Sequence, residues 1–324
     1  MILIPHRHLH FLPWNAMPVA ESGDNKYLGD RFSIRTLASC QILDFCTERE
    51  EIKGKIKQGI VEDTHNDLPC SSYEAQYIAQ MYGVSENQRL RGEAATIDNY
   101  RLLLSQVQRL LSTHHAQSRI DNCMESALVL ADGRLTLGQL LSPAFRFPDL
   151  DEVFIDCCET NLGQVQISDD VLTLNTGFLC AGARGVISSL WSVDDLGTCL
   201  FSIFYHQLRK EGKNRSLALQ LGQRQLRELT GKELKKKYKK ELEKSLDEKL
   251  KATDKQLEEI ELRRDSYAKG SSEYQKLNKE HLKINLIYQH IFDTKNEYLK
   301  AACKKQHPFE HPAYWSAFIC AGLS

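Results

Sequence analysis

The sequence has 324 residues, of which 42% are hydrophobic, and a formal net charge of −1. This size is enough for a large buried core in one α/β domain or in two smaller domains. Its apolar runs fall short of the roughly 20 residues that cross a bilayer, and MILIPHRHLHFLPW at the start lacks the apolar centre and cleavage site of a signal peptide. These features argue against a membrane or secreted protein, and we expect a cytoplasmic location.

Strand-like and helical patterns alternate along most of the chain. In chain order we expect a strand at residues 2–4, a helix at 34–47, a strand at 58–61, helices at 74–82 and 96–104, strands at 109–113, 127–131 and 153–157, a helix at 169–183, a strand at 185–191, helices at 195–211 and from 216, and a strand at 314–321. This alternation predicts an α/β fold whose mostly parallel sheet is covered on both faces. In such sheets, functional residues gather at the carboxyl ends of the strands.

Residues 227–306 follow a different pattern. Apolar side chains recur every three or four positions in residues 246–267 and again in 274–298, and Lys-Gly-Ser-Ser at 269–272 separates the two halves. This pattern predicts an antiparallel helical hairpin with a coiled-coil seam, inserted into a single domain that spans residues 1–324. We expect the hairpin to be a docking surface for a regulatory domain, a substrate or a sister subunit.

The hairpin is also the basic part of the chain, with 20 Lys and Arg against 14 Asp and Glu between residues 231 and 306. The lysines at 235–237, 239 and 240 suggest nucleic acid as one possible ligand. Acidic residues follow within two turns and no stacking aromatic residues are interleaved. A solvated helical face with i,i+4 ion pairs is therefore the favoured interpretation, and we expect no direct nucleic-acid binding.

Metal and cofactor signatures are weak. His6, His8 and His10 alternate, as metal ligands on a strand would, but Pro5 ends the strand and no carboxylate or cysteine lies nearby. The ten cysteines form no C-x-x-C pair, and there is no Gly-rich phosphate loop. We expect no metal and no organic cofactor, and we expect most of the cysteines to be reduced thiols.

Two apolar strands lead into residues suited to nucleophilic catalysis. Residues 109–113 run into His114, and residues 153–157 run into Cys158, each followed by polar, turn-like sequence. Neighbouring parallel strands lie about 4.8 Å apart, so both side chains would reach one cleft. An adjacent imidazole lowers the pKa of a thiol and later protonates the leaving amine. The alternative is a core cysteine and an unrelated histidine.

Six segments, in order, carry a family resemblance. They are PHRHLHFLPWNA (5–16), STHH (112–115), SALVLADGRLTLGQLL (126–141), IDCCETNLG (155–163), DDVLTLNTGFLCAGARGVISSLWSVDD (169–195) and HPAYWSAFICAG (311–322). Together they resemble the CHAT domain family, whose members are relatives of caspases and separases (clan CD), and in particular its bacterial and cyanobacterial members. The resemblance implies a caspase-hemoglobinase-like three-layer sandwich with a mostly parallel sheet.

The resemblance also implies a cysteine endopeptidase with a His/Cys dyad. The family histidine, in a Thr-His-Gly-like motif, falls on His114, and the family cysteine falls on Cys158. Backbone amides at His115 and Cys158 would hold the oxyanion. His115 stands where the family has Gly or Ala, which crowds that site. Cys157 replaces a small residue of the family and is expected in the core.

Acidic residues near the dyad are candidates for substrate binding. Asp156 replaces a family serine two residues before Cys158, and would raise the thiol pKa if the two side chains faced each other. Asp194 and Asp195 belong to a Trp-Ser-Val-Asp-Asp stretch that resembles one in separases, and could receive a basic P1 side chain. The alternative for both aspartates is capping of the helix that follows.

These observations lead to two hypotheses for function. The first is a cysteine endopeptidase that cleaves protein substrates through a thioester and is regulated by a partner or an upstream module. The second is a catalytically silent CHAT scaffold that docks partners.

Overall fold

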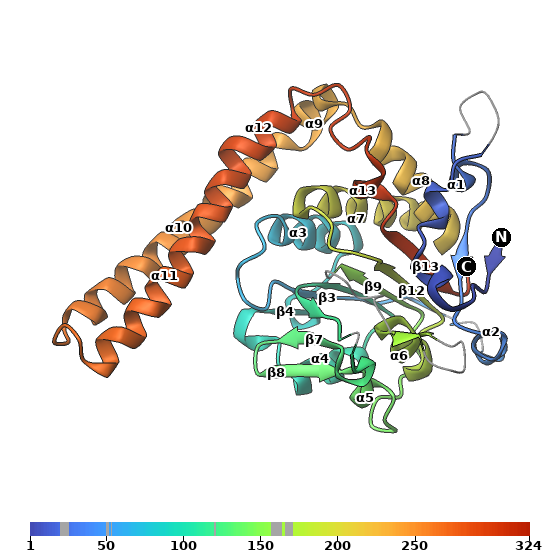
Figure 1. Ribbon diagram of the computed structural model, residues 1–324, viewed down its shortest axis with the longest axis horizontal. Helices are drawn as coiled ribbons and strands as arrows, with labels where there is room; N and C mark the ends of the chain where they lie inside the picture. The colour runs from blue at the N-terminus through green and yellow to red at the C-terminus, as the bar shows by residue number, and fades with distance from the viewer. Residues whose placement is uncertain (20–25, 50–51, 53, 120, 157–163, 166–170) are drawn as a thin grey trace. The chain divides into compact units, whose positions relative to one another are not determined.

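The computed structural model describes residues 1–19, 26–49, 52, 54–119, 121–156, 164–165 and 171–324. Its main sheet has eight strands in the order β1-β2-β13-β12-β9-β5-β3-β4 (Figure 1). The strands are β1 (Ile2–Leu3), β2 (Arg35–Thr36), β3 (Gln58–Glu62), β4 (Arg89–Arg91), β5 (Arg109–Thr113), β9 (Glu152–Asp156), β12 (Gly185–Ser189) and β13 (Phe318–Gly322). The run from β4 to β12 is parallel, and β13 pairs antiparallel with β12.

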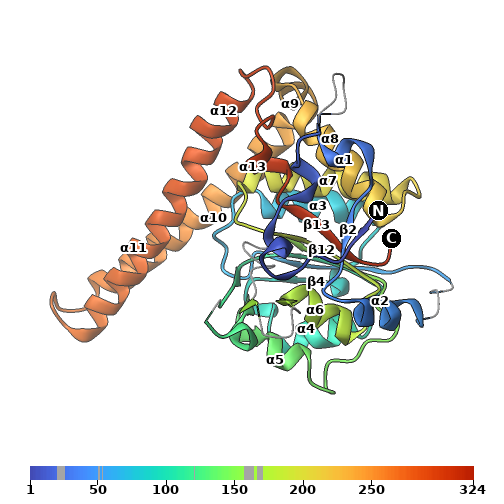
Figure 2. The ribbon, with the colours of Figure 1, turned by 45° about the vertical axis from the view of Figure 1, so that its right-hand side comes forward.

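Helices cover both faces of this sheet, which makes three layers (Figures 1 and 2). One face carries most of α3 (Ser71–Tyr82), together with α7 (Asp195–Lys210) and α8 (Arg215–Glu228). The other carries α2 (Cys40–Thr47), α4 (Ile97–Leu104), α5 (Leu137–Leu140) and α6 (Leu174–Ala181). The predicted α/β class with a mostly parallel sheet is confirmed.

The central strands are apolar on both sides because both sides are covered. Val153, Phe154 and Ile155 of β9 are at most 1% exposed. Phe201 of α7 stacks on Phe318 of β13 with ring centroids 3.9 Å apart. Burial of these side chains supplies the main favourable free energy of folding.

Smaller elements complete the compact unit that contains the main sheet (residues 1–66, 74–228 and 309–324), called the main unit below. They are the helical turns α1 (Leu28–Arg31) and α13 (Pro312–Trp315), the 3₁₀ turns Arg7–Phe11, Trp14–Ala16, Glu86–Gln88, Gly92–Ala94 and Cys123–Glu125, the antiparallel sheet of β6 (Ala116–Gln117), β7 (Ala127–Leu130) and β8 (Gly133–Thr136), and the pair β10 (Gln164–Val165) and β11 (Val171–Leu172).

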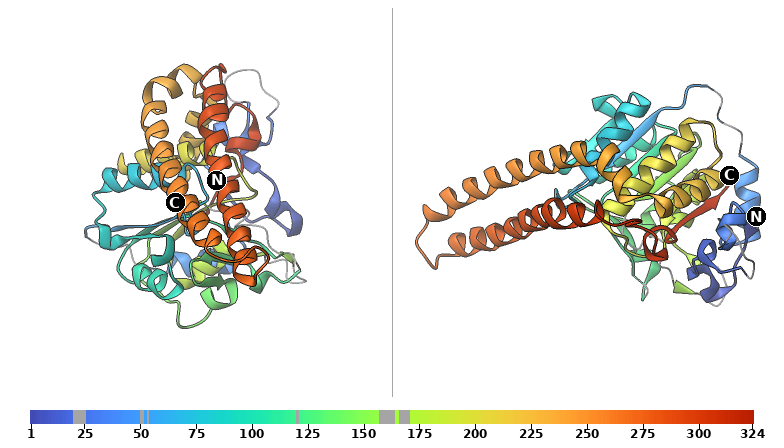
Figure 3. Two further views of the ribbon diagram at one scale, coloured as in Figure 1. Left: turned by 90° about the vertical axis from the view of Figure 1, so that its left-hand side faces the viewer. Right: turned by 90° about the horizontal axis from the view of Figure 1, so that it is seen from above.

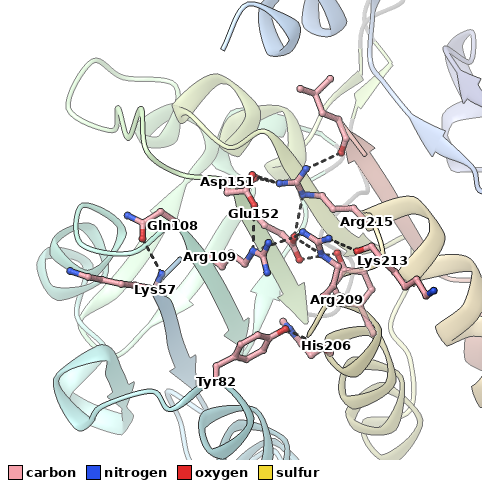
Figure 4. A network of polar contacts seen from close by, with 12 residues as sticks. Lys57, Tyr82, Gln108, Arg109, Asp151, Glu152, His206, Arg209, Lys213 and Arg215 are labelled. Atoms are coloured by element: carbon pink, nitrogen blue, oxygen red, sulfur yellow. Dashed lines mark hydrogen bonds and ion pairs between the residues drawn. The ribbon is translucent and has the colours of Figure 1, made fainter. Parts of the chain in front are cut away.

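A buried ion network lies at the amino ends of β5 and β9 (Figure 4). The Glu152 carboxylate accepts hydrogen bonds from Arg209 at 2.6 Å and from the Tyr205 hydroxyl at 2.8 Å, and pairs with Arg215 at 3.2 Å. Burial alone would raise the pKa of Glu152, but the guanidinium groups of Arg209, Arg215 and Arg109 outweigh it and lower that pKa. The network therefore stays ionised in the core, at the sheet edge opposite to the carboxyl ends.

The second compact unit comprises residues 67–73 and 229–308. It contains α9 (Gly231–Lys237), α10 (Lys239–Asp265), α11 (Ser272–Asp293), a π-helical turn (Thr294–Tyr298) and α12 (Leu299–Ala302). Helices α10 and α11 run antiparallel, side by side (Figure 3). The buried residues of these two helices are Leu242, Leu246, Leu250, Thr253, Ile260, Leu277 and Ile291.

The two ends of the segment 229–308 are joined by backbone hydrogen bonds, and we call this part the base of the unit. The amide of Gly231 donates to the carbonyl oxygens of Lys305 and Gln306 at 3.2 and 3.3 Å. Two of the lysines at its start form i,i+4 ion pairs, Lys237 with Glu233 at 3.4 Å and Lys239 with Glu243 at 3.3 Å.

Three predicted elements were wrong in part, whereas the strand predicted at 127–131 is present as β7 of the small sheet. Residues 34–47 are not one helix, because Arg35–Thr36 pairs with β1 and β13, and the Ser39 hydroxyl caps α2 by accepting from the Ile42 amide. Residues 314–321 split into α13 and β13, since Pro312 starts a helical turn. The predicted helix at 169–183 begins only at Leu174, after the Thr173 cap.

Within the described part of the chain, no helix is both long and apolar enough to span a bilayer. The eight cysteines described there are free thiols.

Candidate active site

Strands β5 and β9 are neighbours in the parallel part of the sheet. Their register sets Ser112 beside Ile155 and Thr113 beside Asp156. The two strands therefore end side by side at the same sheet edge. In the sequence, His114 is the first residue after β5 and Cys158 is the second after β9.

His114 is almost completely buried, with 1% of its surface exposed. Its Nδ1 lies 3.0 Å from the carbonyl oxygen of His115, and its Nε2 lies 2.8 Å from the Ser112 hydroxyl. A carbonyl oxygen can only accept, so Nδ1 carries the ring proton and Nε2 accepts from Ser112. The hydroxyl of Tyr100, from α4, continues the chain to Ser112 at 3.2 Å.

This environment keeps the imidazole neutral. Burial lowers the pKa of His114 to about 4; the hydrogen bond to the His115 carbonyl opposes this shift, and the charges of the His115 and His65 rings add to it. The Tyr100 ring also meets the imidazole edge to face, at a centroid distance of 6.3 Å. The structure thus holds His114 as one defined tautomer whose basic nitrogen is Nε2.

His115 is half-buried and faces a second histidine. Its ring lies 6.3 Å from that of His65, and its carbonyl oxygen also accepts from the Val129 amide at 2.9 Å. Strand β7, which contains Val129, therefore anchors the chain directly after His114.

The predicted nucleophile, Cys158, and its neighbour Cys157 lie outside the described residues. The sequence-based role of Cys158, including its share in an oxyanion site, stays a prediction.

Asp156, at the end of β9, belongs to a cluster of acidic residues with Glu74 and Asp195. The hydroxyl of Thr113 donates to Glu74 of α3 at 3.0 Å, and Glu74 is 1% exposed. Burial raises the pKa of Glu74 well above its ordinary value, and the nearby Asp156 raises it further. Burial likewise raises the pKa of Asp156 to about 7, with a further contribution from the charge of Asp195. A carboxylic acid that keeps its proton near neutral pH thus ends β9.

The two aspartates at the start of α7 differ in their roles. The Asp194 carboxylate caps the helix by accepting from the Gly197 amide at 2.8 Å. Asp195 is half-buried, and its charge acts on Asp156 and on Cys199. Burial, followed by the charges of Glu74 and Asp195, raises the pKa of Cys199 well above its ordinary value, so this thiol is inert near neutral pH.

Sequence reasoning missed Glu74, Ser112 and Tyr100. Ser112 carried a detectable signal, because residues two apart on a strand share a face. Glu74 and Tyr100 come from helices far away in sequence, and only tertiary packing brings them to this edge. No group of three or more metal-ligating side chains occurs in the portion that the structure describes.

One family model and two solved structures are similar to this chain. The family model for the CHAT domain matches residues 1–323. The Arg-specific cysteine proteinase gingipain R (RgpB) is similar at 10% identity over 59% of this chain and 48% of its own, with a TM-score of 0.45. A complex of the pro- and mature domains of Porphyromonas gingivalis RgpB is similar at 10% identity over 58% and 50%, with a TM-score of 0.42.

The chain thus spans about half the length of these two structures. No functionally curated protein matches the chain. The family match extends over nearly every residue, from the first strand to the last. The chain therefore belongs to the CHAT domain family.

Proposed function

We propose that the chain is a cysteine endopeptidase in which Cys158 is the nucleophile and His114 handles the proton. The observation that carries this proposal is the register of β5 and β9, because in the sequence His114 and Cys158 come one and two residues after the ends of these adjacent parallel strands. This is the sheet edge where α/β proteins hold their chemistry. Membership of the CHAT domain family adds support.

The reaction would proceed through a thioester. Nε2 of His114 takes the thiol proton of Cys158, and the thiolate attacks the scissile carbonyl carbon. Backbone amides at His115 and Cys158 hold the resulting oxyanion. The imidazolium gives its proton to the leaving amine, and water then hydrolyses the thioester. The bond from Nδ1 to the His115 carbonyl supports this role, since it leaves Nε2 as the basic nitrogen.

The described state of His114 fits a resting enzyme. Nε2 accepts from Ser112 and the ring is buried, so proton transfer from a thiol requires Nε2 to exchange its partner. We expect low basal activity in the cytoplasm and activation by a regulatory protein or an upstream module, with the hairpin of residues 227–306 as its docking surface.

For the substrate, we propose a protein with a basic P1 residue. Asp195 supports this preference best: Asp194 is already engaged as a helix cap, and Asp156 carries only part of a charge at neutral pH. The test is a peptide library with matched Arg, Lys and neutral P1 residues. Cleavage after neutral residues as readily as after Arg or Lys contradicts the basic pocket, and Asp195→Asn should reduce the preference.

The test of catalysis uses a thiol-directed, substrate-like electrophile. We expect labelling of the wild type, loss of labelling in Cys158→Ala, and at least a hundredfold slower labelling in His114→Ala, because the thiolate loses its proton acceptor. Cys199→Ala is the matched control, since its buried thiol is inert. Equal labelling of the wild type and Cys158→Ala would remove the peptidase proposal.

A catalytically silent scaffold is the second candidate. The buried, doubly bonded imidazole of His114 favours it, since a neutral ring with a pKa of about 4 is a weak base. The same experiment separates the two. A scaffold shows no selective labelling of Cys158 under any condition that keeps the protein folded.

A further inference from the structure

Glu74 connects the ends of the two strands that lead into the candidate dyad. It lies on α3 and is 1% exposed. Its Oε2 accepts from the hydroxyl of Thr113, the last residue of β5, at 3.0 Å. Its carboxyl group is also hydrogen-bonded to that of Asp156, the last residue of β9. Thr113 and Asp156 are direct neighbours in the register of the two strands. We call Thr113, Glu74 and Asp156 the strand-end clamp.

The contact between Glu74 and Asp156 requires a proton. A carboxylate only accepts hydrogen bonds, so two carboxyl groups bond to each other only while one of them is protonated. Burial favours this protonated form: it raises the pKa of Glu74 well above its ordinary value and that of Asp156 to about 7. The two groups therefore share a proton at neutral pH. They repel each other once rising pH has removed it.

The other groups that act on this pair come from α7. Asp195 adds a negative charge near Asp156. The Ser202 hydroxyl lies toward Glu74 and favours its ionised form. The Cys199 thiol has a raised pKa and stays neutral near pH 7. None of these three side chains supplies the positive charge that would hold two ionised carboxylates together, so the shared proton decides whether the pair is bonded.

The strand-end clamp lies on the opposite face of β5 from the imidazole. The Ser112 hydroxyl lies 2.8 Å from Nε2 of His114, so these two side chains share one face. Thr113, between them, points to the other face, where it meets Glu74. Glu74 therefore acts on His114 only through the backbone at the end of β5. That makes it a positioning residue and not a catalytic one.

We propose that Glu74 positions the candidate dyad by clamping the ends of β5 and β9, and that it releases them when the shared proton is lost. The proposal rests on the peptidase function above, because it takes His114 and Cys158 to act at these two strand ends. It adds an upper pH limit to that activity. The limit is set by a pair of side chains on the side of β5 that faces away from the imidazole.

The first test measures how fast Cys158 is labelled, as a function of pH, by peptidyl acyloxymethyl ketones with Arg, Lys and neutral P1 residues. Glu74→Leu fills similar space but cannot bond to either strand end, so we expect labelling at least about tenfold slower than in the wild type. Glu74→Gln keeps both bonds, because its amide donates to Asp156 and its oxygen accepts from Thr113.

The pH profile separates positioning from a merely structural role. Glu74→Gln should label within about threefold of the wild-type rate at neutral pH, and should stay active about one pH unit further into the alkaline range, since no shared proton can be lost. Asp156→Asn should extend the range in the same direction. Glu211→Gln, which changes an exposed carboxylate at the end of α7, is the matched control and should keep the wild-type rate and limit.

A second test does not use catalysis. It compares the urea midpoints of Glu74→Gln, Asp156→Asn and the double variant at about pH 9, where the wild-type pair is repulsive. Each single change should raise the midpoint, and the double variant should gain clearly less than the sum, because either amide already removes the repulsion. In proton NMR, the Nδ1 proton of His114 should exchange with water at least about tenfold faster in Glu74→Leu than in the wild type.

The outcomes separate the clamp from the peptidase. Labelling of Glu74→Leu at the wild-type rate, an unchanged pH limit in Glu74→Gln, or additive midpoints would overturn the clamp even if the wild type labels well. An unlabelled wild type with non-additive midpoints and a faster His114 exchange in Glu74→Leu would overturn the peptidase and leave the clamp standing. Circular dichroism checks that each variant is folded. Should Glu74→Leu fail to fold, Glu74→Gln and the stability cycle decide alone.

Discussion

At the scale of single residues, two carboxyl groups on the same strand behave in opposite ways. Glu152 begins β9 among three arginines, and its pKa is lowered. Asp156 ends the same strand beside Glu74 and Asp195, and its pKa is raised to about 7. Burial by itself raises both pKa values; the arginines reverse the shift at Glu152, whereas at Asp156 burial prevails and the charge of Asp195 adds to it. The carboxyl ends of the strands, near His114, therefore hold carboxylic acids with raised pKa values, whereas the amino ends hold ionised carboxylate–arginine pairs.

We expect Asp156→Asn to stabilise the protein more as pH rises. The folded pKa of Asp156 lies above its ordinary value of about 3.9, so the wild type loses stability as pH rises from about 4 through about 7, while asparagine cannot ionise. The gain should reach about 1–3 kcal/mol at pH 8, after allowance for partial exposure. Urea unfolding at pH 4.5 and 8 measures it.

The control for this prediction is Asp254→Asn, which changes an exposed carboxylate on α10. Its difference from the wild type should be the same at both pH values. An equal difference in the free energy of unfolding between Asp156→Asn and the wild type at both pH values would contradict the raised pKa of Asp156.

The sequence identified His114 because the apolar pattern of residues 109–113 shows where that strand ends, and His114 is the next residue. It was uninformative about Glu74 and Tyr100, which reach the site from other helices. Asp156 was recognised as a candidate near the dyad, but its protonation depends on burial beside Glu74. The local sequence pattern gives the position of a residue in its strand, whereas its pKa depends on the residues that pack around it.

At the scale of elements, strands were easier to predict than helix starts. The strand expected at 109–113 matches β5 in full, since five residues between polar flanks leave little choice of boundary. Helix starts instead depend on caps. Ser39 and Thr173 begin α2 and α6 several residues later than the hydrophobic spacing indicated. The order of strands in the sheet is not encoded in any local pattern.

Gly182, at the end of α6, leaves no room for a side chain. Its φ is +139°, and an added Cβ would lie 2.0 Å from the Phe147 carbonyl oxygen. That backbone is fixed, because the Phe147 amide donates to the Ala181 carbonyl oxygen at 2.7 Å. We expect Gly182→Ala to lower the free energy of unfolding by about 3 kcal/mol or more.

Gly212, at the end of α7, is the matched control. Its φ is +88°, but nothing lies within 4 Å of an added Cβ. Gly212→Ala should cost only about 1 kcal/mol, the penalty of the left-handed conformation itself. Chemical denaturation of both variants tests the comparison, and equal losses would show that the contact with Phe147 is unimportant.

At the scale of the whole molecule, the hairpin unit is closed at its own base. Its two ends meet through the Gly231 amide and the Lys305 carbonyl oxygen, so a short connection can join them. We expect a variant with residues 233–303 replaced by a short Gly-Ser turn to keep the main sheet folded and to melt cooperatively. Circular dichroism should show the loss of helix only. An aggregated or non-cooperative product would mean that the sheet requires the hairpin.

The position of β13 has a consequence for synthesis on the ribosome. Residues 318–322 form a strand inside the sheet, between β2 from near the start of the chain and β12. The gap between β2 and β12 is filled only once residue 322 has left the exit tunnel, after all the hairpin residues have emerged. A nascent chain therefore cannot complete the main sheet before β13 has emerged, so the strands on the two sides of β13 stay unjoined until that point of translation.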